Sequence, residues 1–211
     1  MILINVVLVV AGSIASLIIL GVAFHRLIFL RNPEREIPKG KNIVSPADGK
    51  VIDIIEFKGK DIKIEKGMLG KIKTLTKDIG SQVYIISIFM SPLDVHYNRG
   101  PVSGEILSVK HEKGKFLPVM SIANGLVNEK NEVVIKNKDI GKIKVIQIAG
   151  FLARRIECFV KKGKKIEKGE RFGLINLGSQ ATIIFSKKKG MKIKVSRGDK
   201  VKGGSTILAT Y

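Results

Sequence analysis

Tryptophan is absent from this 211-residue chain, and aromatic residues of all kinds make up only 6% of it. Proteins that bind single-stranded nucleic acid commonly stack bases on aromatic rings, so the composition argues against that class. The single cysteine, Cys158, cannot close an internal disulfide, which fits a reducing compartment and favours a small buried apolar side chain there. No cluster of metal-ligating residues stands out in the sequence, and we expect no bound metal.

Acidic residues are scarce beside basic ones: 18 Asp and Glu stand against 38 Lys and Arg, which gives a net charge of +20. Such a surface attracts anions, including nucleic acid, anionic lipid head groups and acidic partners. A lysine-rich surface is equally typical of heat-adapted proteins, in which most lysines are simply solvated. The charge alone leaves these interpretations open.

Charged side chains of either sign are missing between Ile2 and Phe24. A helix of this length just spans the roughly 30 Å hydrocarbon core of a bilayer, so we predict a transmembrane anchor over residues 1–24. No basic residue precedes the apolar run, which argues against a cleaved signal peptide. The basic residues that follow it place the rest of the chain on the cytoplasmic side of the cell membrane by the positive-inside rule. These residues are Arg26, Arg31, Arg35 and Lys39.

The remainder of the chain divides into a linker and one folded domain. Pro33 and Pro38 interrupt helix formation, so residues 25–42 are expected to be a juxtamembrane linker. Over residues 43–211, short β-branched runs alternate with Gly and Lys-Gly steps, a pattern that predicts strands and turns. We therefore expect a mainly β domain, a barrel-like sandwich with few short helices.

A weak internal repeat lies near the C-terminus. In each copy two glycines flank a central Ile or Val: Gly163 and Gly169 in the first, Gly198 and Gly204 in the second. We expect tight turns in which these glycines have positive φ. The spacing resembles that of lipoyl- and biotinyl-domain sandwiches.

Five short motifs follow one another after the apolar segment. They are Ser45-Pro46-Ala47-Asp48-Gly49, Asp94-Val95-His96, Gly114-Lys115-Phe116, Gln147-Ile148-Ala149-Gly150, and Gly169-Glu170-Arg171-Phe172-Gly173 leading to Leu177-Gly178-Ser179. Each motif alone is a modest signal. In this order they resemble small-form phosphatidylserine decarboxylase proenzymes and their archaeal counterparts, which act on archaetidylserine.

The resemblance implies that the chain cuts itself between Gly178 and Ser179. A serine hydroxyl can attack the preceding carbonyl, and a glycine before it lets the backbone distort into reach. The products would be a β chain, residues 1–178, and an α chain, residues 179–211, in which Ser179 has become a pyruvoyl group. That group would form a Schiff base with the substrate amine and withdraw electrons as CO₂ departs.

His96 and Asp48 are the remaining candidate catalytic residues. An imidazole titrates near neutrality, so His96 suits either the base of self-cleavage or the acid of decarboxylation, and Asp48 would orient it or support processing. The larger family members carry a second histidine where this chain has Arg99, which cannot act as a base near neutral pH. The identity of the processing base is therefore open, with His96 first and His111 second.

Arginines are the candidate substrate-binding residues. Arg99, Arg154 and Arg155 present forked donors that suit a carboxylate or a phosphate. The expected partners are an anionic phospholipid membrane, a serine phospholipid substrate and the α and β chains of one proenzyme. A homo-oligomer is left open, and we expect no nucleic acid.

Two other function classes compete with this interpretation. The repeat is also compatible with a membrane-anchored carrier or adaptor of the lipoyl or biotinyl kind, with Lys192 as its attachment residue. Charge alone would suggest a tethered nucleic-acid binder. A modified Lys192 in an intact chain would favour the carrier, and a chain broken before Ser179 would favour the decarboxylase.

Overall fold

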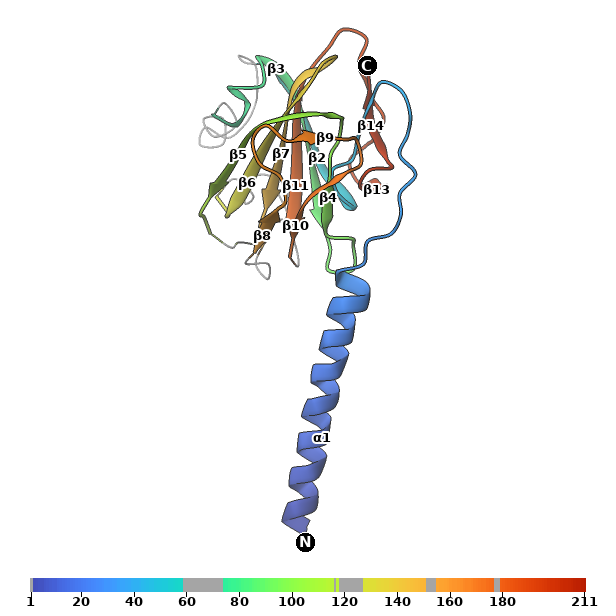
Figure 1. The fold of residues 1–211 in the computed structure, drawn as a ribbon, viewed down its shortest axis with the longest axis vertical. Helices are drawn as coiled ribbons and strands as arrows, with labels where there is room; N and C mark the ends of the chain where they lie inside the picture. The colour runs from blue at the N-terminus through green and yellow to red at the C-terminus, as the bar shows by residue number, and fades with distance from the viewer. Residues whose placement is uncertain (1, 59–73, 116, 118–126, 151–154, 177–178) are drawn as a thin grey trace.

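The computed structural model describes residues 2–58, 74–115, 117, 127–150, 155–176 and 179–211, and Figure 1 shows their fold. Helix α1 (Ile2–Ala23) continues as a π-helix, η1 (Phe24–Phe29), and projects away from a β domain. The side chains from Ile4 to Val22 lie almost entirely exposed on an apolar helix that is long enough to cross a membrane. The first residues of the expected linker are thus helical.

The rest of the described chain forms fourteen strands in three sheets. The strands are β1 (Asn42–Val44), β2 (Gly49–Lys58), β3 (Gln82–Met90), β4 (Tyr97–Arg99), β5 (Gly104–Glu112), β6 (Lys130–Asn137), β7 (Gly141–Ile148), β8 (Ile156–Cys158), β9 (Lys165–Ile166), β10 (Arg171–Ile175), β11 (Ser179–Ser186), β12 (Lys192–Ile193), β13 (Lys200–Val201) and β14 (Ile207–Thr210). The prediction of a mainly β domain behind an apolar helix is confirmed.

The largest sheet has eight antiparallel strands in the order β13-β2-β3-β11-β7-β6-β5-β9. Strand β11 lies at its centre, where Ser179 pairs with Met90 of β3 and Gln180 pairs with Ile148 of β7. Nearly every residue of β11 is buried, because both faces of the sheet are covered at this point. Strands β4, β10 and β8 form a second sheet, and β1, β14 and β12 a third.

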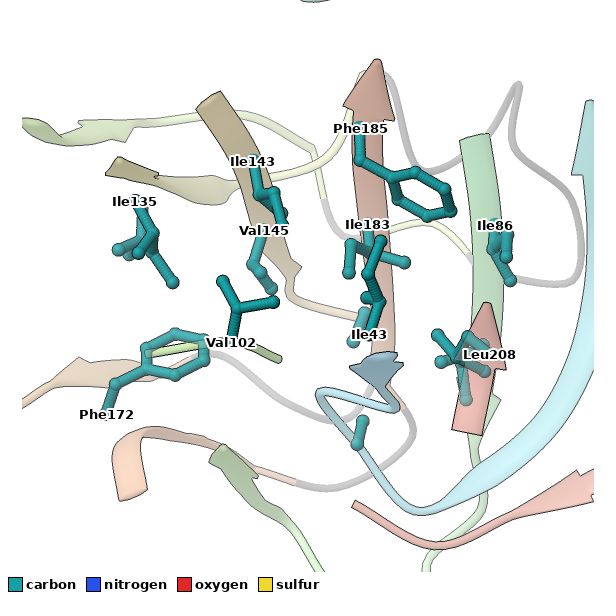
Figure 2. Close-up of a cluster of buried hydrophobic side chains, with 14 of the residues drawn as sticks. Ile43, Ile86, Val102, Ile135, Ile143, Val145, Phe172, Ile183, Phe185 and Leu208 are labelled. Carbon is teal, nitrogen blue, oxygen red and sulfur yellow. The ribbon is translucent and has the colours of Figure 1, made fainter. Parts of the chain in front are cut away.

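The main core lies between the large sheet and the two small ones. Figure 2 shows Phe172 of β10 and Leu208 of β14 in the same apolar cluster as Val145 and Ile183 of the large sheet. A smaller cluster covers the other face, where Leu75 packs near Ile184 and neighbouring side chains. Alternating side chains of the central strands therefore point into two separate apolar layers.

The glycine repeat has the backbone geometry that its sequence predicts. The φ angles of Gly163 and Gly169 are 86° and 83°, and those of Gly198 and Gly204 are 101° and 82°. Residues other than glycine rarely adopt these values. Lys192 lies in strand β12, paired with Thr210, and not at the tip of a turn.

Two phenylalanines provide a test of this core. Replacing Phe172, which has no exposed surface, by alanine should lower the free energy of unfolding by about 3–5 kcal/mol, since it leaves a cavity between sheets. Phe159→Ala is the matched control: its side chain is 48% exposed, and the loss should stay near about 1 kcal/mol. Urea unfolding in detergent micelles, followed by circular dichroism, measures both. Equal losses would contradict the described packing.

Candidate active site

Ser179 is the first residue of β11 and is completely buried. Its hydroxyl donates to the thioether of Met90, with an Oγ–Sδ distance of 3.5 Å. A thioether is a weak acceptor, so little holds this hydroxyl in its present orientation. Gly178, the other residue of the expected cleavage site, lies outside the described residues.

The start of β11 lies at the end of the sheet from which the apolar helix extends (Figure 1). Met90, the partner of Ser179, is the last residue of β3, and the loop that follows it contacts the helix end. In that loop the backbone carbonyl of Leu93 accepts a hydrogen bond from Arg31. The site is thus positioned beside the end of the apolar helix.

The backbone carbonyl of His96 accepts a hydrogen bond from Ile175, four residues before Ser179, and the imidazole is completely buried. The ring of Phe29 covers it, with 4.0 Å between the two ring centroids. Neither ring nitrogen has a hydrogen-bond partner in the described part of the chain. Burial is the main reason why the pKa of His96 falls to about 4; the backbone and the carboxylate of Asp94 oppose the shift, and the charge of Arg31 adds a smaller contribution to it. His96 is therefore neutral near pH 7 and able to accept a proton.

A row of buried amides connects the region of Ser179 to the small sheet. The Asn98 amide nitrogen points at the Met90 thioether, 3.9 Å away, and Asn98 Oδ1 accepts a hydrogen bond from Gln147 Nε2 at 2.9 Å. Gln147 Oε1 accepts in turn from Asn131 at 2.8 Å. These amides satisfy one another in a low-dielectric interior, which fixes their orientation.

We did not predict from the sequence that these amides form a hydrogen-bonded group, although one feature of the sequence indicated it. Gln147 continues the inward-facing positions of Ile143 and Val145 on β7, where an apolar residue would be expected. Gly173 makes room opposite, because a Cβ there would lie 2.5 Å from Gln147 Nε2. A polar residue at an inward position thus indicates the site.

Asp48 is engaged by partners other than His96. Its carboxylate accepts hydrogen bonds from Arg35 and from the backbone of Gly203, each at 2.7 Å. Burial raises the pKa of Asp48, and these two partners offset part of the rise. No hydrogen bond joins Asp48 to His96, so its expected support of processing stays a prediction.

Arg99 was expected to bind the substrate, but in this structure its guanidinium forms hydrogen bonds with other parts of the protein. Its guanidinium donates to the carbonyl of Gly169 at 2.9 Å, to Asn32 Oδ1 at 2.6 Å and to the carbonyl of Pro33 at 3.3 Å. Burial also lowers the pKa of Arg99. In this structure the side chain ties the linker to the domain.

The other candidate residues are more exposed. Arg155 is 75% exposed and pairs loosely with Glu157 at 3.4 Å, while Arg154 lies outside the described residues. His111 lies on β5, three strands from β11, and its Nε2 is 3.3 Å from a carboxylate oxygen of Glu129. Three strand spacings are roughly 14 Å along a sheet, which favours His96 over His111 as the group that serves Ser179. Among the described residues, no three His, Cys, Asp or Glu side chains converge on a common metal position.

Comparison with known proteins extends these observations. A sequence model of the family described as phosphatidylserine decarboxylase matches residues 24–209. A protein of Methanocaldococcus jannaschii, provisionally named archaetidylserine decarboxylase proenzyme, is 38% identical over 94% of this chain and 93% of its own length. The phosphatidylserine decarboxylase proenzyme of Carboxydothermus hydrogenoformans is 39% identical over 93% and 83%, respectively. That of Geobacter metallireducens is 36% identical over 98% and 89%.

The pair formed by Arg35 and Asp48 makes a testable contribution to stability. Arg35→Met leaves a buried carboxylate without its cation, which should cost about 3 kcal/mol near pH 7. The pKa of Asp48 in the folded state, already raised, should rise further. Protonation then relieves the unpaired charge, so the deficit relative to wild type should shrink as pH falls from 7 toward 4.

Urea unfolding at a series of pH values measures this dependence. Lys110→Ala is the control, because its pair with Glu112 is exposed, and it should leave the unfolding midpoint unchanged near pH 7. A deficit for Arg35→Met that is the same at every pH would show that the unpaired Asp48 carboxylate is not its cause.

Proposed function

The chain belongs to the phosphatidylserine decarboxylase family, and from that premise we propose that it is a self-processing, pyruvoyl-dependent enzyme acting on a membrane lipid. Membership makes it a decarboxylase of the lyase class. The substrate would be phosphatidylserine or archaetidylserine, and the products CO₂ and the corresponding ethanolamine lipid. The observation that carries the proposal is Ser179: a buried, weakly bonded hydroxyl at the start of the central strand, in the same region as an unpaired buried histidine.

Self-cleavage would begin at the Ser179 hydroxyl. Its oxygen attacks the Gly178 carbonyl carbon, the carbon–nitrogen bond between the two residues breaks, and an ester replaces the amide. The hydroxyl proton passes through a base to the released nitrogen. Loss of the Ser179 Cα proton then expels residues 1–178 as a carboxylate, and water displaces ammonia to leave the pyruvoyl group on residues 179–211.

The surroundings of Ser179 fit such a group. It would occupy the space that the serine already fills, on a strand held on one side by β3 and on the other by β7. Its carbonyl would supply the chemistry by condensing with the substrate amine and accepting the electrons that the departing carboxylate leaves behind. The strand would keep that carbonyl in place after the chain is cut.

His96 is the proposed proton carrier. As a neutral imidazole without a partner, it can take the Ser179 proton in the uncleaved chain once its ring turns toward the hydroxyl. In the mature enzyme the substrate carboxylate would raise the pKa of His96, so that the imidazole could take up a proton and deliver it to the carbon that has lost CO₂. The absence of a hydrogen bond between the two side chains does not oppose this role, because catalytic contacts often form only in the reacting complex.

Asp48 and the arginines would assist Ser179 and His96 by holding the linker or binding the substrate. Asp48 supports processing indirectly by holding Arg35 of the linker and the backbone of Gly203. Arg155 is exposed and could exchange its loose pair with Glu157 for the lipid phosphate, with Arg154 beside it in sequence. Arg99 would contribute to substrate binding only by releasing its bonds to the linker.

The membrane supplies the substrate in this proposal. The apolar helix would anchor the chain in the cell membrane, with the catalytic domain on the cytoplasmic side where the basic residues after Phe24 lie. The net charge of +20 would draw the domain toward an anionic leaflet. The names of the relatives, proenzymes for these two lipids, support an α chain and a β chain made from one precursor.

Ser179→Ala provides the direct test. The wild-type chain should resolve on a denaturing gel and by intact mass into fragments 1–178 and 179–211, whereas the variant should stay whole and inactive. Incubation of the wild type with substrate and borohydride should attach the lipid to the smaller fragment. An uncut wild-type chain that decarboxylates the lipid would refute the proposal.

His96→Gln tests the base, with His111→Gln as its counterpart. Loss of the proton acceptor proposed for Ser179 should slow self-cleavage by at least about 100-fold. His111→Gln should cleave at the wild-type rate, since His111 lies three strands from β11. The rates are measured by gel after synthesis in a cell-free system. A slow His111→Gln with an unaffected His96→Gln would reverse the assignment.

A further inference from the structure

The end of the membrane-spanning helix closes directly over His96. Phe29, the last residue of η1, has no exposed surface, and its ring lies on the imidazole at a tilt of 35°. On its other side His25 stacks on the same ring, with centroids 5.4 Å apart. Leu27, two residues away, is 74% exposed, so burial in this turn is specific to the side that faces the site.

Hydrogen bonds hold the segment after Phe29 against the domain. Arg31 donates to the carbonyl of Leu93, in the loop that leads to His96. Asn32 and Pro33 accept from Arg99, and Arg35 pairs with Asp48. A segment that only tethered the domain would need none of these bonds. Together they fix the position of Phe29 relative to the imidazole.

Phe29 covers one side of His96. Its ring supplies an apolar surface and no hydrogen-bonding group, so on that side the imidazole meets neither water nor a polar partner. The charged groups near the imidazole are Asp94 on its own loop and Arg31 on the linker, and His25 lies beyond Phe29. The neutral ring is the form that can accept a proton from a hydroxyl, and burial keeps His96 neutral.

We propose that Phe29 is a positioning residue of the active site and that the membrane-spanning helix thereby completes the catalytic centre as well as anchoring the chain. The helix end forms the wall that keeps water from His96. The significance for the reaction rests on the function proposed above, but the enclosure itself does not depend on it.

The proposal predicts a change in the pKa of His96 when the wall is removed. Phe29→Ala lets water reach the imidazole, so the pKa of His96 should rise from about 4 toward its ordinary value of 6.5. Phe29→Gln should raise it too, because its amide can accept a hydrogen bond from the protonated ring. Phe29→Leu keeps an apolar wall and should leave the pKa low, as should Leu27→Ala, the matched control on the exposed side.

Nuclear magnetic resonance of ¹³C-labelled histidine measures this pKa in the full chain, in nanodiscs. All variants carry Ser179→Ala, so that every sample is uncut, and His25→Gln and His111→Gln identify the remaining signals. The result expected is titration of His96 near pH 6 in Phe29→Ala and Phe29→Gln, and below pH 5 in the parent. Unchanged titration in whichever of these two variants folds, judged by circular dichroism, would overturn the proposal.

A second measurement separates this proposal from the proposed function. With Ser179 present, cleavage requires neutral His96, so the wild type should keep its rate as pH falls to about 5. Phe29→Ala should lose most of its rate between about pH 7 and 5, because its His96 protonates there. If the wild-type chain never cleaves, the proposed function is refuted. The role of Phe29 is still tested in that case, because the titration of His96 is measured in uncut Ser179→Ala chains. A cleavage profile identical in wild type and Phe29→Ala refutes the role of Phe29.

Discussion

The placement of β11 between β3 and β7 is the constraint on which the rest of the structure depends. The strand that precedes it, β10, belongs to a different sheet and pairs with β4 and β8. The connection between Ile175 and Ser179 therefore joins two sheets that are each held by other partners. Apart from position 179 itself, a cut in this connection would leave the described pairing of β11 with β3 and β7 in place, which the break required by the proposed function needs.

The fragment after such a cut would remain bound without a covalent link. Residues 179–211 supply the centre of the large sheet through β11, pair β13 with β2, and pair β14 with β1. Side chains of this segment, including Ile183, Phe185 and Leu208, belong to the main core. Burial of that apolar area would hold the two products together, and the new terminus at Ser179 would stay where the serine had been.

Local patterns in the sequence predicted the parts of the fold that local chemistry decides. The uncharged run before His25 predicted the apolar helix, β-branched runs predicted strands, and the repeated glycines predicted positive φ. The contacts of the site were not predictable in this way. Arg99 bonds to Asn32 across 67 positions of sequence, and Phe29 covers His96 across a similar separation. Such contacts depend on how the linker folds back on the domain, which no local pattern encodes.

These contacts explain why this chain can have Arg99 at the position where the larger family members carry a second histidine. A buried guanidinium is expensive unless its donors are used, and here the carbonyls of Gly169 and Pro33 and the amide of Asn32 use them. The arginine thus holds the linker, the linker holds Phe29, and Phe29 lies on His96. A histidine at position 99 would have fewer donors for those acceptors and a shorter reach. In this chain that position fixes the end of the apolar helix over His96, and under the proposed function it would thereby set the proton-carrying group at the boundary where a lipid head group arrives.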